Sequence, residues 1–246
     1  MLFRSVSKRI VIAVDHLPQT LFTPELKTFP VVLHGKLTGS TRLRTSFTGK
    51  KGQQLVFEVE AQRLGSKIRP VLHLYNSNQL QLTWAMPSRS LHGDSRIQIT
   101  LPADGKYTLE LHDLLYAASA PNHFRLKIGN WKYTDLVFPP AVQQGKATSL
   151  ELIGNTLTNN RVSLTATGLL PNVPAPWLDQ KTASGMQPNV TVSSYPEVVE
   201  VASGKLLQKL PGIPCGISGR LSQSGEQDLY ELNVKTGDRL RFEVFA

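Results

Sequence analysis

Short runs in which apolar and polar residues alternate dominate the first half of the chain. Leu55, Phe57 and Val59 each have polar or small neighbours, and residues 96–101 and 107–111 repeat the pattern. Strict alternation over so few residues is typical of half-buried antiparallel strands, whose side chains point in turn to the two sides of a sheet. Turn-forming residues separate the runs, at 49–52, 76–79 and 103–105. The pattern therefore predicts an all-β fold.

The spacing of these runs indicates how the strands are organised. Expected strand starts near residues 30, 41, 54, 70, 80, 95, 106 and 122 follow one another at intervals of roughly 10–16 residues, which suits a β-sandwich or jelly roll. From about residue 133 the pattern changes. Strands are expected at 148–153, 161–166 and 189–193, and the Pro-rich stretch 171–188 is expected to be a mobile loop or an insertion.

An internal repeat relates the middle of the first half to the end of the chain. Residues 51–61 recur as 236–246, and residues 35–37 recur as 219–221. A repeat of this length is too long for a solenoid and predicts tandem modules. The second copy stops before the strands that would complete its sheet, and half a sandwich exposes unpaired strand edges. We therefore expect 205–246 to be a truncated second module and the chain to be a piece of a longer protein.

The N-terminal residues resemble the lead-in to the second copy, since 12–18 is similar to 190–196. We therefore expect 1–28 to be the end strand of a preceding module plus a linker, with the strand near 10–14. A basic start followed by apolar residues also has the outline of a secretory signal. The apolar stretch is shorter than the roughly 7–15 residues of a signal core, and Asp15 and His16 end it.

Composition narrows the classes of protein. With 40% hydrophobic and 18% charged residues among 246, the chain has enough apolar material for packed cores. Its one cysteine, Cys215, excludes an internal disulfide framework and any cysteine-built metal centre, and we expect it to be a buried small side chain in a strand rather than a reactive thiol. No apolar run approaches the roughly 18 residues that span a bilayer.

The net charge of +9 is concentrated in 29–132, which holds fourteen basic and six acidic residues. Arg42 and Arg44 alternate with Leu43 and so point to one side, and Lys50 and Lys51 follow in the next turn. Two interpretations stand: a docking face for an anionic polymer, such as an acidic cell-envelope polysaccharide, or an ordinary solvated surface. Further basic residues near this group are Arg63, Lys67 and Arg69, against Glu58 and Glu60. Nucleic acid is disfavoured, because neither a helix nor an aromatic platform accompanies the charge.

Catalytic chemistry has little support in the sequence. His92, Asp94 and Ser95 are the residue types of a nucleophilic triad, but near neighbours along a chain rarely achieve the required geometry, and the group is ordinary turn material. No glycine pattern joins a strand to a helix as a phosphate loop does. We therefore expect no catalytic residue and no organic cofactor.

Histidines give one candidate for a metal site. His73 and His112 lie in expected strands and His34 lies at a strand end, so pairing of strands could bring two of them together. The favoured interpretation is three half-exposed strand histidines with hydrogen-bond partners. No metal site is therefore predicted.

The four blocks 53–66, 70–72, 101–109 and 124–129 together resemble the bacterial pre-peptidase C-terminal domain, in the form repeated in large surface proteins. The resemblance covers 29–132 and, as the first half of a second copy, 205–246, and 133–204 is similar to the immunoglobulin-like module between such copies. It implies a jelly-roll β-sandwich, then an immunoglobulin-like sandwich, then a truncated second jelly roll. It also implies export and no catalysis.

Some members of this family bind calcium, and the sequence departs from their pattern. Where relatives carry acidic residues, this chain reads Ser-Thr-Arg-Leu-Arg at 40–44 and Ala-Met-Pro-Ser-Arg-Ser at 85–90. Calcium takes six to eight oxygen ligands, several of them carboxylates, so no calcium is expected in the first copy. The second copy keeps Glu226 and Asp228, and calcium there stays open.

The function expected from these observations is that of a non-catalytic accessory or structural module of an exported modular bacterial protein, serving spacing, adhesion or presentation at the cell surface. The alternative is a polysaccharide-binding accessory module of a secreted hydrolase whose catalytic domain lies outside this chain. The expected partners are neighbouring modules and anionic cell-surface polysaccharide. The expected location is extracellular, at the cell surface or periplasmic.

Overall fold

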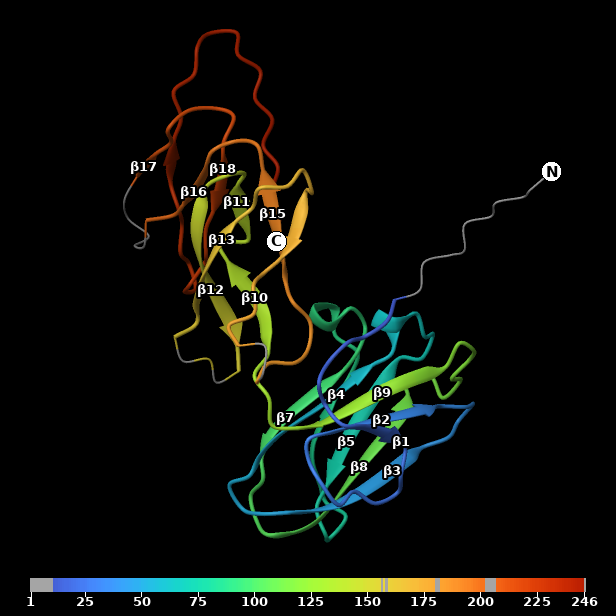
Figure 1. The fold of residues 1–246 in the computed structure, drawn as a ribbon. Helices are drawn as coiled ribbons and strands as arrows, with labels where there is room; N and C mark the ends of the chain where they lie inside the picture. The colour runs from blue at the N-terminus through green and yellow to red at the C-terminus, as the bar shows by residue number, and fades with distance from the viewer. Residues whose placement is uncertain (1–10, 156, 158, 180–181, 202–206, 246) are drawn as a thin grey trace, which may run out of the picture. The chain divides into compact units, whose positions relative to one another are not determined.

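Strands form nearly all the regular structure of the chain (Figure 1). The computed structural model describes residues 11–155, 157, 159–179, 182–201 and 207–245, and it divides into two units between Trp131 and Lys132. Within those ranges the helical segments are two short 3-10 turns, Gln62–Leu64 and Arg89–Leu91, and no helix is long and apolar enough to cross a membrane. The prediction of an all-β fold is confirmed.

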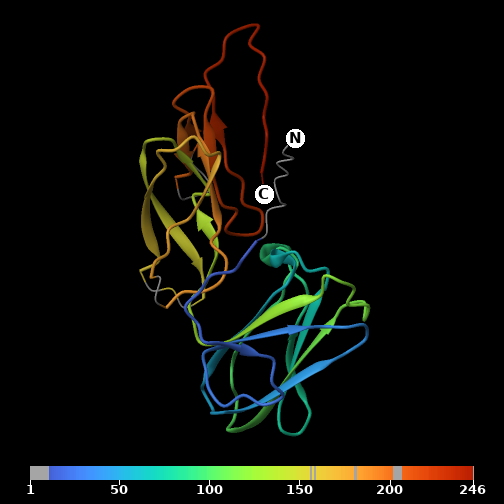
Figure 2. The ribbon, with the colours of Figure 1, turned by 45° about the vertical axis from the view of Figure 1, so that its right-hand side comes forward.

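Two sheets lie face to face in the first unit (Figure 2). The five-stranded sheet has the order β1-β2-β9-β4-β7, and the four-stranded sheet has the order β3-β8-β5-β6. Apart from β1, whose pairing with β2 is parallel, all neighbours in both sheets are antiparallel. The bounds are β1 Gln19–Leu21, β2 Val31–Lys36, β3 Leu43–Gly49, β4 Gln54–Glu60, β5 Pro70–Tyr75, β6 Gln81–Ala85, β7 Arg96–Thr100, β8 Gly105–Asp113 and β9 His123–Gly129.

The strand order is that of a jelly roll. The chain crosses between the sheets at almost every connection, and the two four-stranded sets β2-β9-β4-β7 and β3-β8-β5-β6 interleave along the sequence. The eight expected strand starts each fall within two residues of β2 to β9. The predicted jelly-roll sandwich is confirmed by this topology.

The core of this sandwich forms where the apolar sides of the two sheets meet. Leu55, Phe57 and Val59 of β4 are at most 2% exposed and pack with Leu72 of β5 and Leu109 of β8. Alternation predicts these core positions correctly because each strand turns every second side chain toward the facing sheet. The Phe47 ring contacts the rings of Phe29, Phe57 and Tyr107 in this core, with centroids 5.4–5.6 Å apart.

One expectation about β4 is wrong. The alternation predicts a half-buried strand with one solvated side, but Val56, Glu58 and Glu60 on the other side are buried as well. The reason is a network of ion pairs on the outer side of the five-stranded sheet, in which Arg63, Arg96 and Lys127 surround Glu58. A polar position in an alternating strand therefore need not face water.

The N-terminal strand is also placed differently. Residues 11–14, within the expected strand, adopt no strand conformation, and Val11, Ile12 and Val14 are 63–91% exposed. The strand instead forms at Gln19–Leu21 and joins the edge of β2, where Val32 N–H donates to the Pro18 carbonyl and Phe22 N–H donates to the His34 carbonyl, both at 2.8 Å. An open sheet edge offers unpaired backbone groups, and these residues satisfy them. Residues 1–10 lie outside the described residues.

The second unit contains two three-stranded sheets with a small apolar core. The sheets have the orders β10-β12-β13 and β11-β15-β14, and the core includes Val142, Leu150 and Val190, each at 0% exposed. The expected strands at 148–153, 161–166 and 189–193 correspond to β12, β13 and β15. The bounds are β10 Thr134–Phe138, β11 Ala141–Gln143, β12 Ala147–Gly154, β13 Arg161–Thr165, β14 Asn172–Pro174 and β15 Asn189–Ser193.

The Pro-rich stretch 171–188 is less irregular than expected. Its first part forms β14, which pairs antiparallel with β15, and Ala175 N–H donates to the Pro188 carbonyl at 2.9 Å. Proline is tolerated there because β14 lies at the edge of its sheet.

The C-terminal residues form only short pairings. Strands β16 Glu197–Val199 and β18 Gly216–Ser218 pair with each other, as do β17 Gln208–Lys209 and β19 Tyr230–Glu231. Residues 232–245 contain no strand, although 236–246 repeats the sequence pattern of β4 and its flanks. The side chains of Phe242, Val244 and Phe245 are 73–90% exposed.

Candidate binding face

A row of polar and aromatic side chains crosses the four-stranded sheet on the side away from the core. Arg44 on β3 lies opposite Glu110 on β8, Glu110 lies opposite His73 on β5, and His73 lies opposite Trp84 on β6. Because alternate residues of a strand share a side, and the neighbours Leu72 and Leu74 fill the core, these four side chains point outward together.

Five rings are arranged around this row. His73 lies nearly parallel to Trp84, with centroids 6.3 Å apart and an angle of 13°, and nearly parallel to Tyr75, at 6.1 Å and 22°. His112 lies nearly parallel to Tyr116, at 4.6 Å and 4°. We call this group, together with Arg42, Arg44 and Glu110, the outer aromatic face.

Two of the rings are open to solvent. Trp84 is 52% exposed and Tyr116 is 40% exposed, so part of each side chain is accessible to a ligand. Large exposed aromatic side chains are uncommon on a soluble surface and are enriched where proteins bind ligands. The outer aromatic face therefore has the form of a binding surface.

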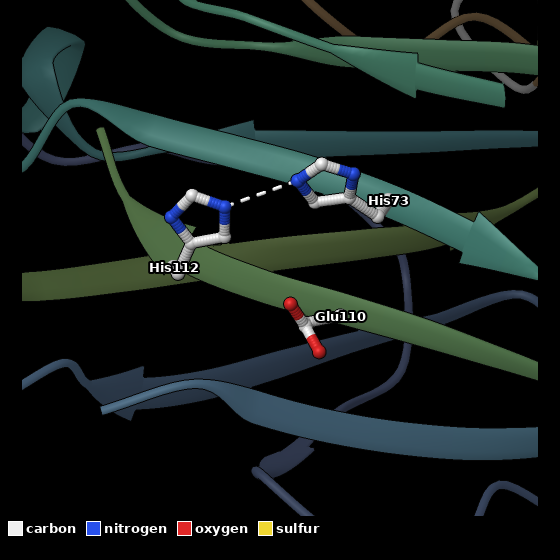
Figure 3. A group of neighbouring side chains, drawn as sticks. All are labelled: His73, Glu110 and His112. Atoms are coloured by element: carbon white, nitrogen blue, oxygen red, sulfur yellow. Dashed lines mark hydrogen bonds between the residues drawn. The ribbon is translucent and has the colours of Figure 1, made fainter. Parts of the chain in front are cut away.

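His73, Glu110 and His112 meet at the centre of the face (Figure 3). The two Nε2 atoms lie 3.0 Å apart, and a carboxylate oxygen of Glu110 lies within 4.8 Å of both. His112 Nδ1 contacts the Asp113 carbonyl at 2.9 Å, and His73 Nδ1 contacts Gln81 Oε1 at 2.7 Å. The structure thus brings together two of the three histidines that the sequence singled out.

The two predicted arginines hold the carboxylate of this centre. Arg44 Nε donates to Glu110 Oε2 at 2.7 Å, and Arg42 Nη1 lies 3.9 Å from Glu110 Oε1. The side chain of Glu110 is 2% exposed, while both arginines are more than half exposed. The Arg42 guanidinium also lies over the Tyr116 ring, 5.3 Å from its centroid. The single negative charge of Glu110 therefore neutralises one of the two arginine charges, and the outer part of both arginine side chains stays accessible to solvent.

The two predicted lysines lie elsewhere. Lys50 and Lys51 follow the far end of β3, about six residues or ~20 Å of extended strand from Arg44. Both are exposed, and Lys51 N–H donates to Asp104 Oδ1 at 2.6 Å to close the turn. Arg42, Arg44, Lys50 and Lys51 thus form two separate pairs at opposite ends of one strand.

Arg63, also named among the basic residues of this region, is buried in an ion-pair network on the outer side of the five-stranded sheet. Its Nη2 donates to Glu58 at 2.9 Å and its Nε donates to Asp94 at 2.8 Å. Arg96 Nε and Lys127 Nζ approach Glu58 at 2.8 and 3.2 Å. Arg63 therefore stabilises the fold and is no part of a docking face.

Buried charges of both signs set the electrostatics of this network. Burial by itself raises the pKa of Glu58, but the charges of Lys127, Arg63 and Arg96 outweigh it and hold the pKa at about 2, below the ordinary 4.5. Burial raises the pKa of Asp94, which the Arg63 charge and the N–H groups of Ala61 and Gln62 only partly offset. Arg125 pairs with Asp15 at 2.7 Å and also with Glu60, and Lys127 Nζ reaches Glu60 at 3.1 Å.

The residues of the possible triad, His92, Asp94 and Ser95, do not form a catalytic arrangement. Asp94 is fully buried and accepts hydrogen bonds from Ala61 N–H at 3.0 Å and Gln62 N–H at 2.8 Å, while His92 is exposed with a left-handed backbone, φ 51°. Ser95 Oγ is buried. An Asp that fixes a turn in this way does not orient the imidazole of a general base.

Four further residues that the sequence singled out lie outside the outer aromatic face. His34 hydrogen-bonds Gln19 Oε1 at 2.7 Å, and burial lowers its pKa. Cys215 is half-buried and directly precedes β18 rather than lying in a strand, and burial raises its pKa. Glu226 accepts the N–H groups of Ser222 and Gln223 and so closes its own turn, and Asp228 is half-buried.

The aromatic members of the face were not predicted from the sequence. Tyr75 and Trp84 lie on the outward positions of two strands joined by the turn 76–79, and Tyr116 follows β8. The sequence does contain a signal for Tyr75 and Trp84: each is an aromatic residue at a strand position whose neighbour along the strand is apolar and faces the core. Such a residue stands out once strands are assigned, because outward positions are normally polar.

No family model and no curated protein matches the chain. Among solved structures, it is similar to the pre-peptidase C-terminal domain of collagenase from Bacillus anthracis, at 12% identity and a TM-score of 0.32, over 47% of this chain and 97% of that one. It is also similar to PliG, a periplasmic inhibitor of g-type lysozyme, from Aeromonas hydrophila, at 19% identity and a TM-score of 0.33, over 47% and 98%. The PliG of Salmonella Typhimurium is similar at 18% identity and a TM-score of 0.32, over 46% of this chain and 96% of that one. A pre-peptidase C-terminal domain is thus among the similar structures, as the sequence blocks predicted.

Proposed function

We propose that the chain is a non-catalytic accessory part of an exported modular protein, and that its first unit binds acidic polysaccharide through the outer aromatic face. The observation that carries this proposal is the pair of exposed rings, Trp84 and Tyr116, on the same side of one sheet as Arg42 and Arg44. A sugar ring presents a flat C–H surface to an aromatic face and hydroxyl groups at its rim, while a uronic or sulfated unit adds an anion for the guanidinium groups.

The charge of the first unit supports an anionic ligand. Of the basic residues in 29–132, Arg63, Arg96, Arg125 and Lys127 are paired in the buried network. The remaining basic residues still outnumber Asp104, Glu110 and Asp113, so the surface is positive on balance. Such an excess favours association with polyanions without specifying which one. The rings of the face would supply the selectivity.

The second candidate function is that of a spacer that presents other domains and binds no ligand. It is favoured by the modular repeat of 51–61 in 236–246, which supports neighbouring modules as partners. Export rests on the resemblance of the sequence blocks to the pre-peptidase C-terminal domain. In that case the outer aromatic face would be a solvated surface. The two functions differ in one measurable property, which is the effect of Trp84 on affinity for polysaccharide.

We predict that the full chain binds polygalacturonate at low salt and that Trp84→Ala weakens this binding about tenfold. Losing one stacked ring from a contact removes about 1.4 kcal/mol or more, which is a factor of ten in the dissociation constant. Isothermal titration calorimetry of the full chain with oligogalacturonate measures it directly. Raising the salt should weaken binding of both proteins, because the charges on this face are exposed.

The matched control is Lys50→Gln with Lys51→Gln, which removes two positive charges from the far end of the same strand. The double variant should retain at least half of the wild-type affinity. If it loses as much affinity as Trp84→Ala, binding follows net charge and the face has no special role. If the wild-type chain does not bind at low salt, the spacer function stands.

A further inference from the structure

The centre of the outer aromatic face has the donor set of a transition-metal site. His73 on β5, Glu110 on β8 and His112 on β8 each offer one ligand atom, and these atoms lie within 4.8 Å of one another. We propose that His73 Nε2, His112 Nε2 and a Glu110 carboxylate oxygen bind one zinc-class divalent ion. Two imidazole nitrogens and a carboxylate are a recurrent zinc ligand set, with the fourth position left to water or a ligand.

The proposal rests on the orientation of the three ligand side chains, because each of them contacts a second partner through an atom that would not bind the metal. The Nδ1 of His112 faces the Asp113 carbonyl at 2.9 Å, and the Nδ1 of His73 faces Gln81 Oε1 at 2.7 Å. Glu110 Oε2 accepts from Arg44 Nε at 2.7 Å. Metal-binding histidines nearly always donate their second N–H to a carbonyl or carboxylate in this way, which fixes the ring and leaves the other nitrogen bare.

The facing Nε2 atoms are the second observation. A carbonyl oxygen can only accept, so Nδ1 of His112 carries a proton, and in the neutral ring its Nε2 is then a bare lone pair. With Gln81 Oε1 as the acceptor, the same holds for His73. At 3.0 Å the two Nε2 atoms need either a proton on one of them, which gives the hydrogen bond drawn in Figure 3, or a cation that lies against both. A metal ion bound by both nitrogens satisfies this requirement.

The distances suit such an ion after a small adjustment. Two nitrogens at zinc bond lengths in a tetrahedral arrangement lie about 3.3 Å apart, compared with 3.0 Å between the Nε2 atoms here. The rings are nearly parallel, at 16°, so the ion would lie to one side of the line between them. Figure 3 shows the Glu110 carboxylate on one side of that line. The rings would pivot slightly in their planes, and the carboxylate would move toward the ion.

The site is selective by its chemistry. Neutral imidazole nitrogens suit zinc, copper and nickel, whereas calcium and magnesium require many more oxygen ligands than this centre offers. The guanidinium groups of Arg42 and Arg44 lie beside Glu110 and reduce the attraction for a cation. We therefore expect zinc affinity well below that of a closed structural site, and no response to calcium. Metal binding does not depend on the proposed binding of polysaccharide.

The test is titration of the full metal-free chain with zinc chloride by isothermal calorimetry, without any polysaccharide. We expect one ion per chain for the wild type and at least a tenfold loss of affinity for His73→Gln and for His112→Gln. His34→Gln is the matched control, because it removes a strand histidine with the same kind of glutamine partner in the other sheet. It should bind zinc as the wild type does, and calcium should give no heat.

A further variant tests the orientation of the rings. Gln81→Glu offers only acceptor oxygens to His73 Nδ1, which forces the tautomer with a bare Nε2, so it should bind zinc severalfold more tightly than the wild type. Circular dichroism of each variant checks that it is folded. In a second readout, cobalt bound to the wild type should give the intense visible absorption of a four-coordinate site, and His73→Gln should lose it.

Three results would overturn the proposal. The first is the absence of stoichiometric zinc binding by the wild type. The second is equal binding by wild type, His73→Gln and His112→Gln, or an equal loss in His34→Gln. The third is weaker binding by folded Gln81→Glu, which would mean that the two histidines share a proton in an ordinary hydrogen bond.

Discussion

Replacing Glu58 by Gln is expected to lower the free energy of unfolding of the first unit by about 3–5 kcal/mol, because breaking a buried ion pair from one side leaves the partner charge uncompensated. The Glu58 side chain is 0% exposed, and three cationic groups lie within 3.2 Å of its carboxylate. Lys127 is itself 1% exposed and would keep only Glu60 as a partner, so water cannot replace Glu58. A neutral amide of the same size keeps the volume and removes the charge.

Urea unfolding of the full chain at neutral pH, followed by far-ultraviolet circular dichroism and by the exchange of β4 and β9 amides, measures this loss. Glu25→Gln is the matched control, since it makes the same chemical change at an exposed position of the same unit and should alter stability by at most about 0.5 kcal/mol. Equal stability of Glu58→Gln and the wild type would mean that the network contributes nothing net. The slope of free energy against urea should stay unchanged.

Acidification is expected to remove about 3 kcal/mol of the same stability. The folded chain holds the pKa of Glu58 at about 2, whereas the unfolded chain returns it to its ordinary value of 4.5. The unfolded state therefore binds the proton first as pH falls, so the stabilisation is complete above about pH 5 and is lost progressively down to about pH 2. A difference of roughly two and a half pKa units corresponds to about 3 kcal/mol.

Other groups titrate in the same range, and a comparison of two proteins separates them. Asp94, whose pKa is raised by burial, acts in the opposite direction, because the folded state binds its proton more tightly. The difference in unfolding free energy between the wild type and Glu58→Gln cancels the contributions of groups outside the network, whereas Asp94 shares Arg63 with Glu58 and its contribution cancels only in part. That difference should be greatest near neutral pH and should shrink as pH falls from about 5 to 2. A difference that is constant with pH would contradict the assignment of the low pKa to Glu58.

The strand pattern predicted most of the jelly roll, because every core strand buries one side against a facing sheet. Leu55, Phe57 and Val59 alternate in the sequence and lie in the core for that reason. Alternation without a partner strand failed: Val11, Ile12 and Val14 are exposed and form no strand. The same limit applies to 236–245, which repeats the pattern of β4, whereas β4 itself lies between β9 and β7. A pattern predicts a strand only where another strand pairs with it.

The sequence predicted single residues of the candidate site but not how they come together. His73 and His112 could be named as candidates, but their meeting depends on the register between β5 and β8, in which His73 faces Glu110 and Val71 faces His112. Charge counts could not separate a docking arginine from a structural one. Arg42 lies on the surface and Arg63 is buried, because the partners of Arg63 come from β4 and from Asp94, about thirty residues further on. Long-range pairing of this kind leaves no local signal.

Ligand binding is expected at the outer aromatic face of the four-stranded sheet. It is tested most directly by the indole N–H resonances of the three tryptophans in the isotope-labelled full chain, recorded while oligogalacturonate is added at low salt. Trp84 is 52% exposed on this face, Trp131 is 4% exposed, and Trp177 belongs to the second unit. The Trp84 resonance is expected to shift with saturation, while those of Trp131 and Trp177 stay in place. A saturating shift at Trp131 or Trp177 with Trp84 unmoved would contradict it.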